Sequence, residues 1–248
     1  MTRIDLNSDL GEGAGTDEAI MPHVTSANVA CGAHAGDADT MRRTIALALA
    51  HAVAVGAHPG YRDPANFGRL PLDLPDDVLE HDLRLQIETL RALARRAGAA
   101  LAHVKAHGAL YNRAEREERT AGVIAAAVRS VDPALLLFAP PGSALERAAA
   151  AAGLRVAREG FVDRAYEPDG TLRSRRLDGA LHTDPAVAAA QAVSLARDGT
   201  VRASDGTVLD LQVDTLCLHG DTPNAPLIAR AVRRALAEAE VTVRAIGA

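Results

Sequence analysis

The sequence predicts a TIM-like (β/α) barrel, an α/β fold in which seven parallel strands alternate with helices. The chain has 248 residues, and one such barrel commonly needs about 250. Short apolar runs alternate throughout with longer stretches of helical period, which favours a parallel sheet with right-handed crossovers. Apolar residues make up 48% of the chain, enough for a sizeable core. We therefore expect one barrel domain over residues 1–248, with an open doubly wound sheet as the alternative.

Seven short apolar runs are the expected strands. Most are rich in Leu or β-branched residues and lack clean alternation, as strands buried on both faces do. The runs are Ile4–Leu6, Val24–Ala30, Val53–Ala57, Leu101–Lys105, Leu135–Ala139, Leu154–Ala157 and Thr215–Leu218. A further strand is expected near the end of the chain, at Val241–Ile246, and a small hairpin at 199–213, turning at Asp205-Gly206.

Helices are expected between these strands because apolar residues there recur at helical spacing. One stripe includes Met41, Ile45 and Ala48, and another Leu79, Leu83, Ile87, Leu90 and Leu93. The expected helix ends are Gly98 as a C′ residue, Ser143 to Glu146 as a capping box, and Asp184 and Thr222 as N-caps before proline.

Composition excludes several classes of function. Lys and Arg number 27 against 32 Asp and Glu, and the two signs are interleaved. With three Phe, three Tyr and no Trp, the chain lacks the aromatic platforms and the basic stripe that suit nucleic acid. It has no apolar run of about eighteen residues and no signal-peptide core at its N-terminus. We expect a soluble cytoplasmic protein that binds neither nucleic acid nor membrane.

Four predicted strands end in a histidine with a glycine one or two residues behind it. They carry His34, His58, His107 and His219. Because parallel strands present their C-terminal ends to one face, we expect these side chains to converge around one cavity together with Asp9. A hydrogen-bonded structural role is the competing interpretation for any one of them. The other histidines lack the pattern and are expected to be ordinary: His23, His51, His81, His103 and His182.

Acidic and basic residues accompany these histidines. Asp9 and Glu12 follow the first strand on a glycine-rich loop, where carboxylates ligate metals, act as general bases or cap the loop. Lys105 ends the fourth strand and suits a carboxylate or phosphate, the alternative being a buried pair with Asp9 or Glu12. Lys105 and His107 are two residues apart, so in an extended chain they point the same way. Cys31 is expected to be small filler, with nucleophilic use as the alternative.

The sequence contains no phosphate-binding P-loop of the Gly-x-x-x-x-Gly-Lys-Ser/Thr type. No Gly-x-Gly-x-x-Gly run follows a strand either, since 11–15 has the wrong spacing. A nucleotide, if one is used, must bind through another arrangement or on another subunit.

Six blocks, in order along nearly the whole chain, resemble the LamB/YcsF family. They are Asp5–Glu12, Ser26–Asp37, Gly56–Tyr61, Val104–Asn112, Glu159–Tyr166 and His219–Pro223. Two positions depart from the family pattern: Ser8 stands where the family usually carries Cys, which argues against an essential thiol there, and Ala106 where it often carries Pro.

The resemblance implies both a fold and an activity. Members of the family are the A subunit of a bacterial ATP-dependent 5-oxoprolinase, and their seven-stranded barrel is related to the glycoside hydrolase and deacetylase barrels. The implied reaction cleaves 5-oxoproline to glutamate with ATP as co-substrate, in a complex with two other subunits, B and C. A divalent metal is expected either as Mg²⁺ with ATP or as an ion bound at the site.

We assign candidate roles from the strand-end pattern and the resemblance together. The candidate catalytic residues are Asp9, Glu12, His58, His107 and His219, and the candidate substrate-binding residues are Asn28, His34, Lys105 and Arg164. If a metal is bound, Asp9, His58 and His107 are its expected ligands. Two alternatives stay open: an independent metal-dependent deacetylase or hydrolase acting on carbohydrate, and a non-catalytic subunit that only binds the lactam.

Overall fold

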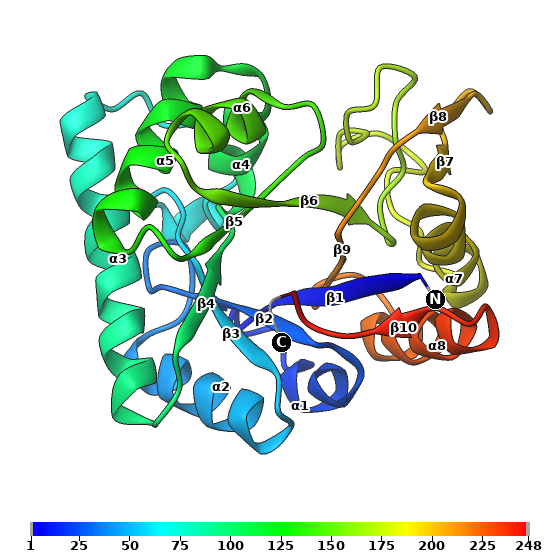
Figure 1. The fold of residues 1–248 in the computed structure, drawn as a ribbon, viewed down its shortest axis with the longest axis horizontal. Helices are drawn as coiled ribbons and strands as arrows, with labels where there is room; N and C mark the ends of the chain where they lie inside the picture. The colour runs from blue at the N-terminus through cyan, green and yellow to red at the C-terminus, as the bar shows by residue number, and fades with distance from the viewer. Residues whose placement is uncertain (1, 247–248) are drawn as a thin grey trace. The chain divides into compact units, whose positions relative to one another are not determined.

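The computed structural model describes residues 2–246. Its main sheet pairs strands in the order β10-β1-β2-β3-β4-β5-β6-β9, and β9 also pairs with β1. Strands β1 to β6 and β9 therefore close into a seven-stranded barrel with flanking helices (Figure 1), which confirms the predicted fold class. The strands are β1 (Arg3–Leu10), β2 (Ser26–Ala30), β3 (Ala54–His58), β4 (Leu101–Val104), β5 (Leu136–Ala139), β6 (Arg155–Phe161), β9 (Thr215–His219) and β10 (Thr242–Val243).

Helices follow most of the strands, as expected for crossover connections. They are α1 (Asp17–Ile20), α2 (Ala38–Ala50), α3 (Asp76–Arg96), α4 (Gly108–Arg116), α5 (Glu118–Val131), α6 (Ala144–Ala151), α7 (Pro185–Val193) and α8 (Ala225–Glu238). The predicted hairpin is confirmed: β7 (Thr200–Arg202) and β8 (Val208–Asp210) pair antiparallel. Within residues 2–246, no helix combines the length and the apolar character that crossing a bilayer would require.

The chain divides into two compact units. Unit 1 comprises Met1–Ser8, Gly15–Ser26 and Glu159–Ala248, and unit 2 comprises Asp9–Ala14 and Ala27–Arg158. Three of the four divisions fall within strands β1, β2 and β6, and the fourth falls between Ala14 and Gly15, in the segment between β1 and α1.

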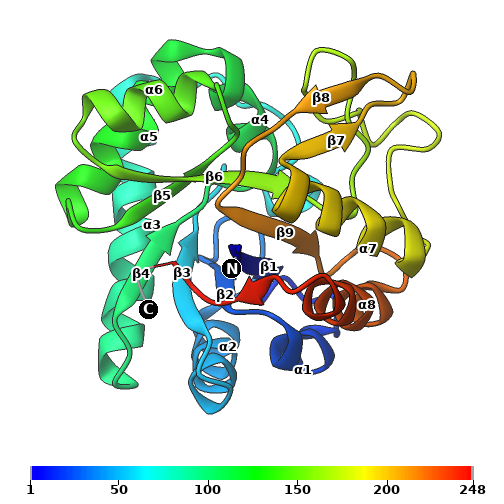
Figure 2. The same cartoon turned by 45° about the vertical axis from the view of Figure 1, so that its right-hand side comes forward.

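In unit 2, helix α3 packs on β3, β4 and α5 (Figures 1 and 2). The predicted stripe is buried through Leu90, and its last buried position is Ala94 rather than Leu93. Each fully buried Leu or Ile side chain stabilises the packing by about 1.5–3 kcal/mol relative to exposure. This packing holds β3 and β4, whose C-terminal ends carry His58 and Lys105, against a fixed outer layer.

Most of the predicted helix ends are confirmed. Gly98 follows the C-cap of α3 with φ +84°, Ser143 Oγ accepts a hydrogen bond from Glu146 N, and Asp184 caps α7. The N-cap assigned to Thr222 is wrong, because α8 begins at Ala225 after Asn224. The Thr222 hydroxyl instead donates a hydrogen bond to the carboxylate of Asp163.

Candidate active site

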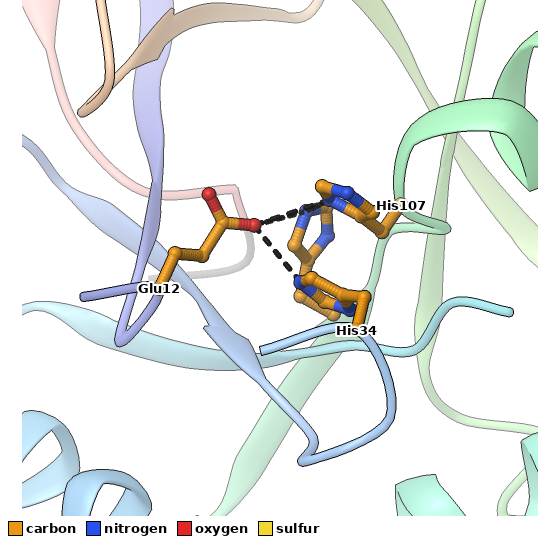
Figure 3. Close-up of side chains that lie close together, drawn as sticks. Glu12, His34 and His107 are labelled. Carbon is orange, nitrogen blue, oxygen red and sulfur yellow. Dashed lines mark hydrogen bonds and ion pairs between the residues drawn. The ribbon is translucent and has the colours of Figure 1, made fainter. Parts of the chain in front are cut away.

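Four side chains of unit 2 form what we call the Glu12 cluster: Glu12, His34, His58 and His107. Each follows or ends a different barrel strand, in order from β1 to β4. Glu12 Oε1 lies 3.0 Å from His34 Nε2, 3.1 Å from His107 Nδ1 and 3.5 Å from His58 Nε2. Figure 3 shows His34 and His107 directed at the Glu12 carboxylate. Their rings are stacked, with centroids 3.7 Å apart. The strand-end pattern thus brings three of its four histidines together.

Backbone carbonyls fix the tautomers of two of these imidazoles. His58 Nδ1 lies 2.8 Å from the Lys105 carbonyl oxygen, and His107 Nε2 lies 2.8 Å from that of Phe67. A carbonyl oxygen only accepts, so both of these nitrogens carry protons. The other two nitrogens, His58 Nε2 and His107 Nδ1, face each other at 2.9 Å. Two lone pairs at this distance repel, so the geometry requires a proton or a metal cation between them.

Burial and neighbouring charge act in opposite directions on these groups. Burial alone would lower the pKa of His58, but Asp9 and Glu12 outweigh it and raise that pKa. Burial dominates at the other two rings, and it lowers the pKa of His107 and brings that of His34 to about 4. Burial would raise the pKa of Glu12, but the neighbouring imidazoles of His107, His34 and His58 lower it well below its usual range. Glu12 is therefore a carboxylate at neutral pH.

The cluster also has the donor set of a divalent metal site. One ligand atom from each of the four residues lies within 4.8 Å of all the others. Imidazole nitrogens and a carboxylate suit zinc and similar ions. The ring N–H groups of His58 and His107 donate to carbonyl oxygens, as those of metal-bound histidines usually do. The residues therefore fit a divalent cation, and the group contains two of the three expected ligands, His58 and His107, together with Glu12 and His34.

Asp9 belongs to a second buried group beside the cluster. Its Oδ1 accepts from Lys105 Nζ at 2.9 Å and from Asn28 Nδ2 at 2.8 Å, while its Oδ2 lies 3.4 Å from His58 Nε2. Asn28 Oδ1 in turn lies 2.7 Å from Nε2 of His103. Lys105 thus forms a buried ion pair with Asp9, which was the alternative to binding a substrate carboxylate or phosphate.

Glycines around the cluster make room for protein rather than for a ligand. A Cβ on Gly68, whose φ is +61°, would lie 2.8 Å from His34 Cβ and 3.0 Å from His107 Cδ2. Gly60 is equally confined, and the Gln86 side chain bonds both its N–H and its carbonyl. These contacts hold the stacked rings of His34 and His107 in place.

Unit 1 contains a carboxylate–histidine pair. Asp163 Oδ1 lies 3.0 Å from His219 Nδ1, while its Oδ2 accepts from His219 N–H at 3.0 Å and from Thr222 Oγ1 at 2.6 Å. Phe161 stacks on the His219 ring. Burial would raise the pKa of Asp163, but His219 and Thr222 lower it well below its usual range. An ionised carboxylate that accepts from Nδ1 leaves Nε2 of His219 as the nitrogen that can exchange a proton.

Arg164, also in unit 1, is a buried cation without a carboxylate partner among the described residues. It is 7% exposed, its Nη2 donates to the Arg173 carbonyl, and its buried Nε has no hydrogen-bond partner among residues 2–246. Burial, followed by the charge of Arg175, lowers the pKa of Arg164 to about 10. The guanidinium therefore stays charged at neutral pH.

Among the candidate residues, Glu12, His34, His58 and His107 come together in unit 2, with Asp9, Asn28 and Lys105 beside them, whereas Arg164 and His219 lie in unit 1. Sequence reasoning assigned no catalytic or binding role to His103, Asp163 or Thr222. Asp163 follows β6 as Asp9 follows the first predicted strand, so the strand-end rule would have found it. Burial raises the pKa of Cys31 to about 12, which disfavours a nucleophilic thiolate.

Comparison with known proteins agrees with this architecture. Residues 4–248 match the model of the LamB/YcsF family. The chain belongs to the LamB/YcsF family. A protein of Symbiobacterium thermophilum, named as the A subunit of 5-oxoprolinase, is 51% identical to it over 99% of this chain and 96% of that protein. The crystal structure of a lactam utilization protein from Thermus thermophilus superposes with a TM-score of 0.93 at 46% identity, covering 98% and 100% of the two chains.

A more distant likeness concerns the fold alone. A peptidoglycan deacetylase from Bacillus subtilis matches with a TM-score of 0.50 at 13% identity, covering 99% of this chain and 88% of that one. This chain therefore shares its barrel fold with that deacetylase. At 13% identity the likeness assigns no residue role to this chain.

Proposed function

We propose that this chain is the A subunit of an ATP-dependent 5-oxoprolinase, which cleaves 5-oxo-L-proline to L-glutamate together with two partner subunits, B and C. The observation that carries the proposal is the 51% identity, over 99% of the chain, to a protein named as that subunit. The name of the 46% identical Thermus thermophilus protein, a lactam utilization protein, supports a cyclic amide as the substrate class.

Chemistry explains why ATP would be needed. A five-membered amide is a poor electrophile, and transfer of the γ-phosphoryl group of ATP to the amide oxygen activates its carbon and releases ADP. Water adds to that carbon, and the C–N bond breaks to give a free amine and an acyl phosphate. A second water then releases phosphate and leaves glutamate. Because the sequence lacks a P-loop, we assign ATP binding to the complex and to no particular residues of this chain.

Two groups of this chain suit the proton transfers. We propose that Nε2 of His219, whose ring Asp163 orients through Nδ1, takes a proton from water or gives one to the leaving nitrogen. In unit 2, Glu12, His58 and His107 form the second group, with Asp9 beside them. Donors such as imidazolium stabilise the oxyanion that develops on the attacked carbon. We propose Asp9, Glu12, His58, His107 and His219 as the catalytic set.

We assign the carboxylate of 5-oxoproline to Arg164 rather than to Lys105. The Lys105 ammonium is already paired with Asp9 at 2.9 Å, and both side chains are at most 5% exposed. Arg164 is charged and buried, and it has no ion pair among residues 2–246. A guanidinium binds a carboxylate through two parallel N–H donors, which also fixes its orientation.

One observation favours a second candidate function, that of a metal-dependent hydrolase or deacetylase. The Glu12 cluster offers three imidazoles and a carboxylate within 4.8 Å of one another. A divalent ion held by these residues would polarise a carbonyl oxygen and acidify a bound water. Elemental analysis of protein purified without chelators, with activity assays on an acetylated sugar and on 5-oxoproline, separates the two functions.

The decisive experiment mixes this chain with its two presumed partner subunits and measures ATP-dependent glutamate release. We expect turnover from the complex and negligible turnover from the chain alone. His107→Ala should lower kcat by about 10²–10⁴-fold, as loss of a positioned acid–base group does. His51→Ala, at the exposed end of α2, is the matched control. Robust turnover by the single chain, or a His107→Ala complex with normal kcat, would contradict the proposal.

A further inference from the structure

His103 occupies a buried position that packing alone does not explain. It lies in β4 with 1% exposure, and its ring stacks on that of Phe138 with centroids 4.3 Å apart and planes 2° apart. The neighbouring strand β3 carries Gly56 at this point, and a Cβ there would lie 2.0 Å from His103 Nε2. An apolar ring would fill the same slot without burying polar atoms, so the imidazole is expected to use its nitrogen.

The hydrogen bonds give that nitrogen a direction. Asn28 Nδ2 donates to Asp9 Oδ1, so the other end of the amide, Oδ1, faces His103 and accepts from its Nε2–H at 2.7 Å. Burial, followed by the charges of Lys105 and His58, lowers the pKa of His103 to about 3. The ring therefore stays neutral and remains a donor to Asn28 at physiological pH.

This donor fixes the orientation of Asn28 and, through it, that of Asp9. If the amide of Asn28 flipped, its oxygen would face the Asp9 carboxylate and its NH₂ would face the His103 N–H, and both contacts are repulsive. In the arrangement observed, Asn28 and Lys105 both donate to Oδ1 of Asp9. The second oxygen, Oδ2, is then turned toward the cluster, 3.4 Å from His58 Nε2.

We propose that His103 is a positioning residue, which acts through Asn28 to hold one oxygen of Asp9 toward His58. The proposal rests on the proposed function only in that Asp9 takes part in the reaction. The signal in the sequence is the pair of Gly56 and His103, a glycine in one strand that faces a histidine in the next.

Two substitutions separate this role from packing. His103→Phe keeps a flat ring against Phe138 and removes the donor, whereas His103→Gln keeps an N–H donor. In the reconstituted complex, His103→Phe should lower kcat by about 10–100-fold, with little change in KM. Losses of this size are usual when a hydrogen-bond partner that orients a site residue is removed. His103→Gln should recover part of the loss, and His51→Ala should have no effect. Normal kcat in His103→Phe, or equal losses in both variants, would overturn the proposal.

A double-mutant cycle tests the route through Asn28. If His103 acts through this amide, His103→Phe should cost little further in kcat once Asn28→Ala is present, so the two losses are strongly non-additive. Additive losses would overturn the proposal. The cycle compares kcat values only among variants that fold and assemble. Thermal unfolding and assembly with the partner subunits are therefore measured first.

A spectroscopic measurement on the chain alone does not depend on activity. The ¹⁵N spectrum of its histidine rings should show His103 as a neutral ring protonated at Nε2 from pH 8 down to about pH 5, a range that stays above its lowered pKa. A ring protonated at Nδ1 only, or one that becomes charged above about pH 5, would overturn the proposal. If the complex shows no turnover while the spectrum agrees, the proposed function fails and the positioning geometry stands.

Discussion

Replacing Gly56 by Ala tests whether the slot for His103 is as tight as the structure shows. The added Cβ would lie 2.0 Å from His103 Nε2, and the ring has no room to retreat because it stacks on Phe138. Overpacking a core costs about 1–3 kcal/mol. Displacing the ring from Asn28 leaves a buried polar group unpaired, at about 1–3 kcal/mol more. We therefore expect Gly56→Ala to lower the free energy of unfolding by roughly 2–6 kcal/mol.

Urea denaturation and thermal unfolding measure this loss. For a chain of this length each kcal/mol shifts Tm by about 2–4 °C, so Tm should fall by at least about 4 °C. The matched control is Gly122→Ala in the exposed face of α5, where an added Cβ meets nothing within 4 Å. That variant should gain about 0.5–1 kcal/mol. The reasoning is refuted if Gly56→Ala is as stable as the control, or if its cost persists in a His103→Ala background, where the ring is gone.

Three further predictions concern the charged groups of the site. Arg164→Gln should raise KM for 5-oxoproline by at least about 10-fold with a smaller change in kcat. The reason is that an ion pair of equal strength in the ground state and the transition state stabilises both alike and so mainly affects substrate binding. Unchanged KM in steady-state kinetics would contradict this. Glu12→Gln should weaken binding of a divalent ion by at least about 10-fold, and elemental analysis with a chelator titration would show it. The lowered pKa of Asp163 implies stability that is present above the unfolded value of about 3.9 and is lost as pH falls. Urea denaturation between about pH 6 and 3 should therefore show a steeper loss for wild type than for Asp163→Asn, and equal slopes would refute this.

Strand and helix order could be predicted because buried parallel strands and amphipathic helices leave different periods in the sequence. The C-terminal end of β1 could not be predicted in this way. Sequence reasoning ended that strand at Leu6, since polar residues usually mark loops, but the strand continues to Leu10. Within unit 1, Asn7 donates to Glu159 and to Thr215, so its amide is buried with its hydrogen bonds made. Such pairings join residues far apart in the chain, and no local pattern records them.

The candidate site was predictable to the extent that it depends on topology. The ends of parallel strands meet, so His34, His58 and His107 could be expected together. The shared direction of Lys105 and His107 stays a prediction from the alternation of an extended chain. The partners of each side chain depend on distances of a few tenths of an ångström and could not be derived this way. Thr222 illustrates the limit, because Thr before Pro is a good N-cap, yet its hydroxyl serves Asp163.

The formal charges of the buried group in unit 2 bear on what lies between His58 and His107. Asp9 and Glu12 carry two negative charges against the one positive charge of Lys105, so with neutral imidazoles the group has one negative charge in excess. A single proton on His58 would cancel it, which agrees with the raised pKa of this ring. A divalent ion would instead leave one positive charge in a buried place, and such a charge is stable only with an anionic ligand. The protonated cluster therefore suits proton transfer to a neutral amide. A cluster loaded with a divalent ion would instead bind an anionic ligand, such as hydroxide or an oxygen of a carboxylate or phosphate. Since both states account for the 2.9 Å contact, direct measurement of bound metal decides between them, and a pH–rate profile alone does not.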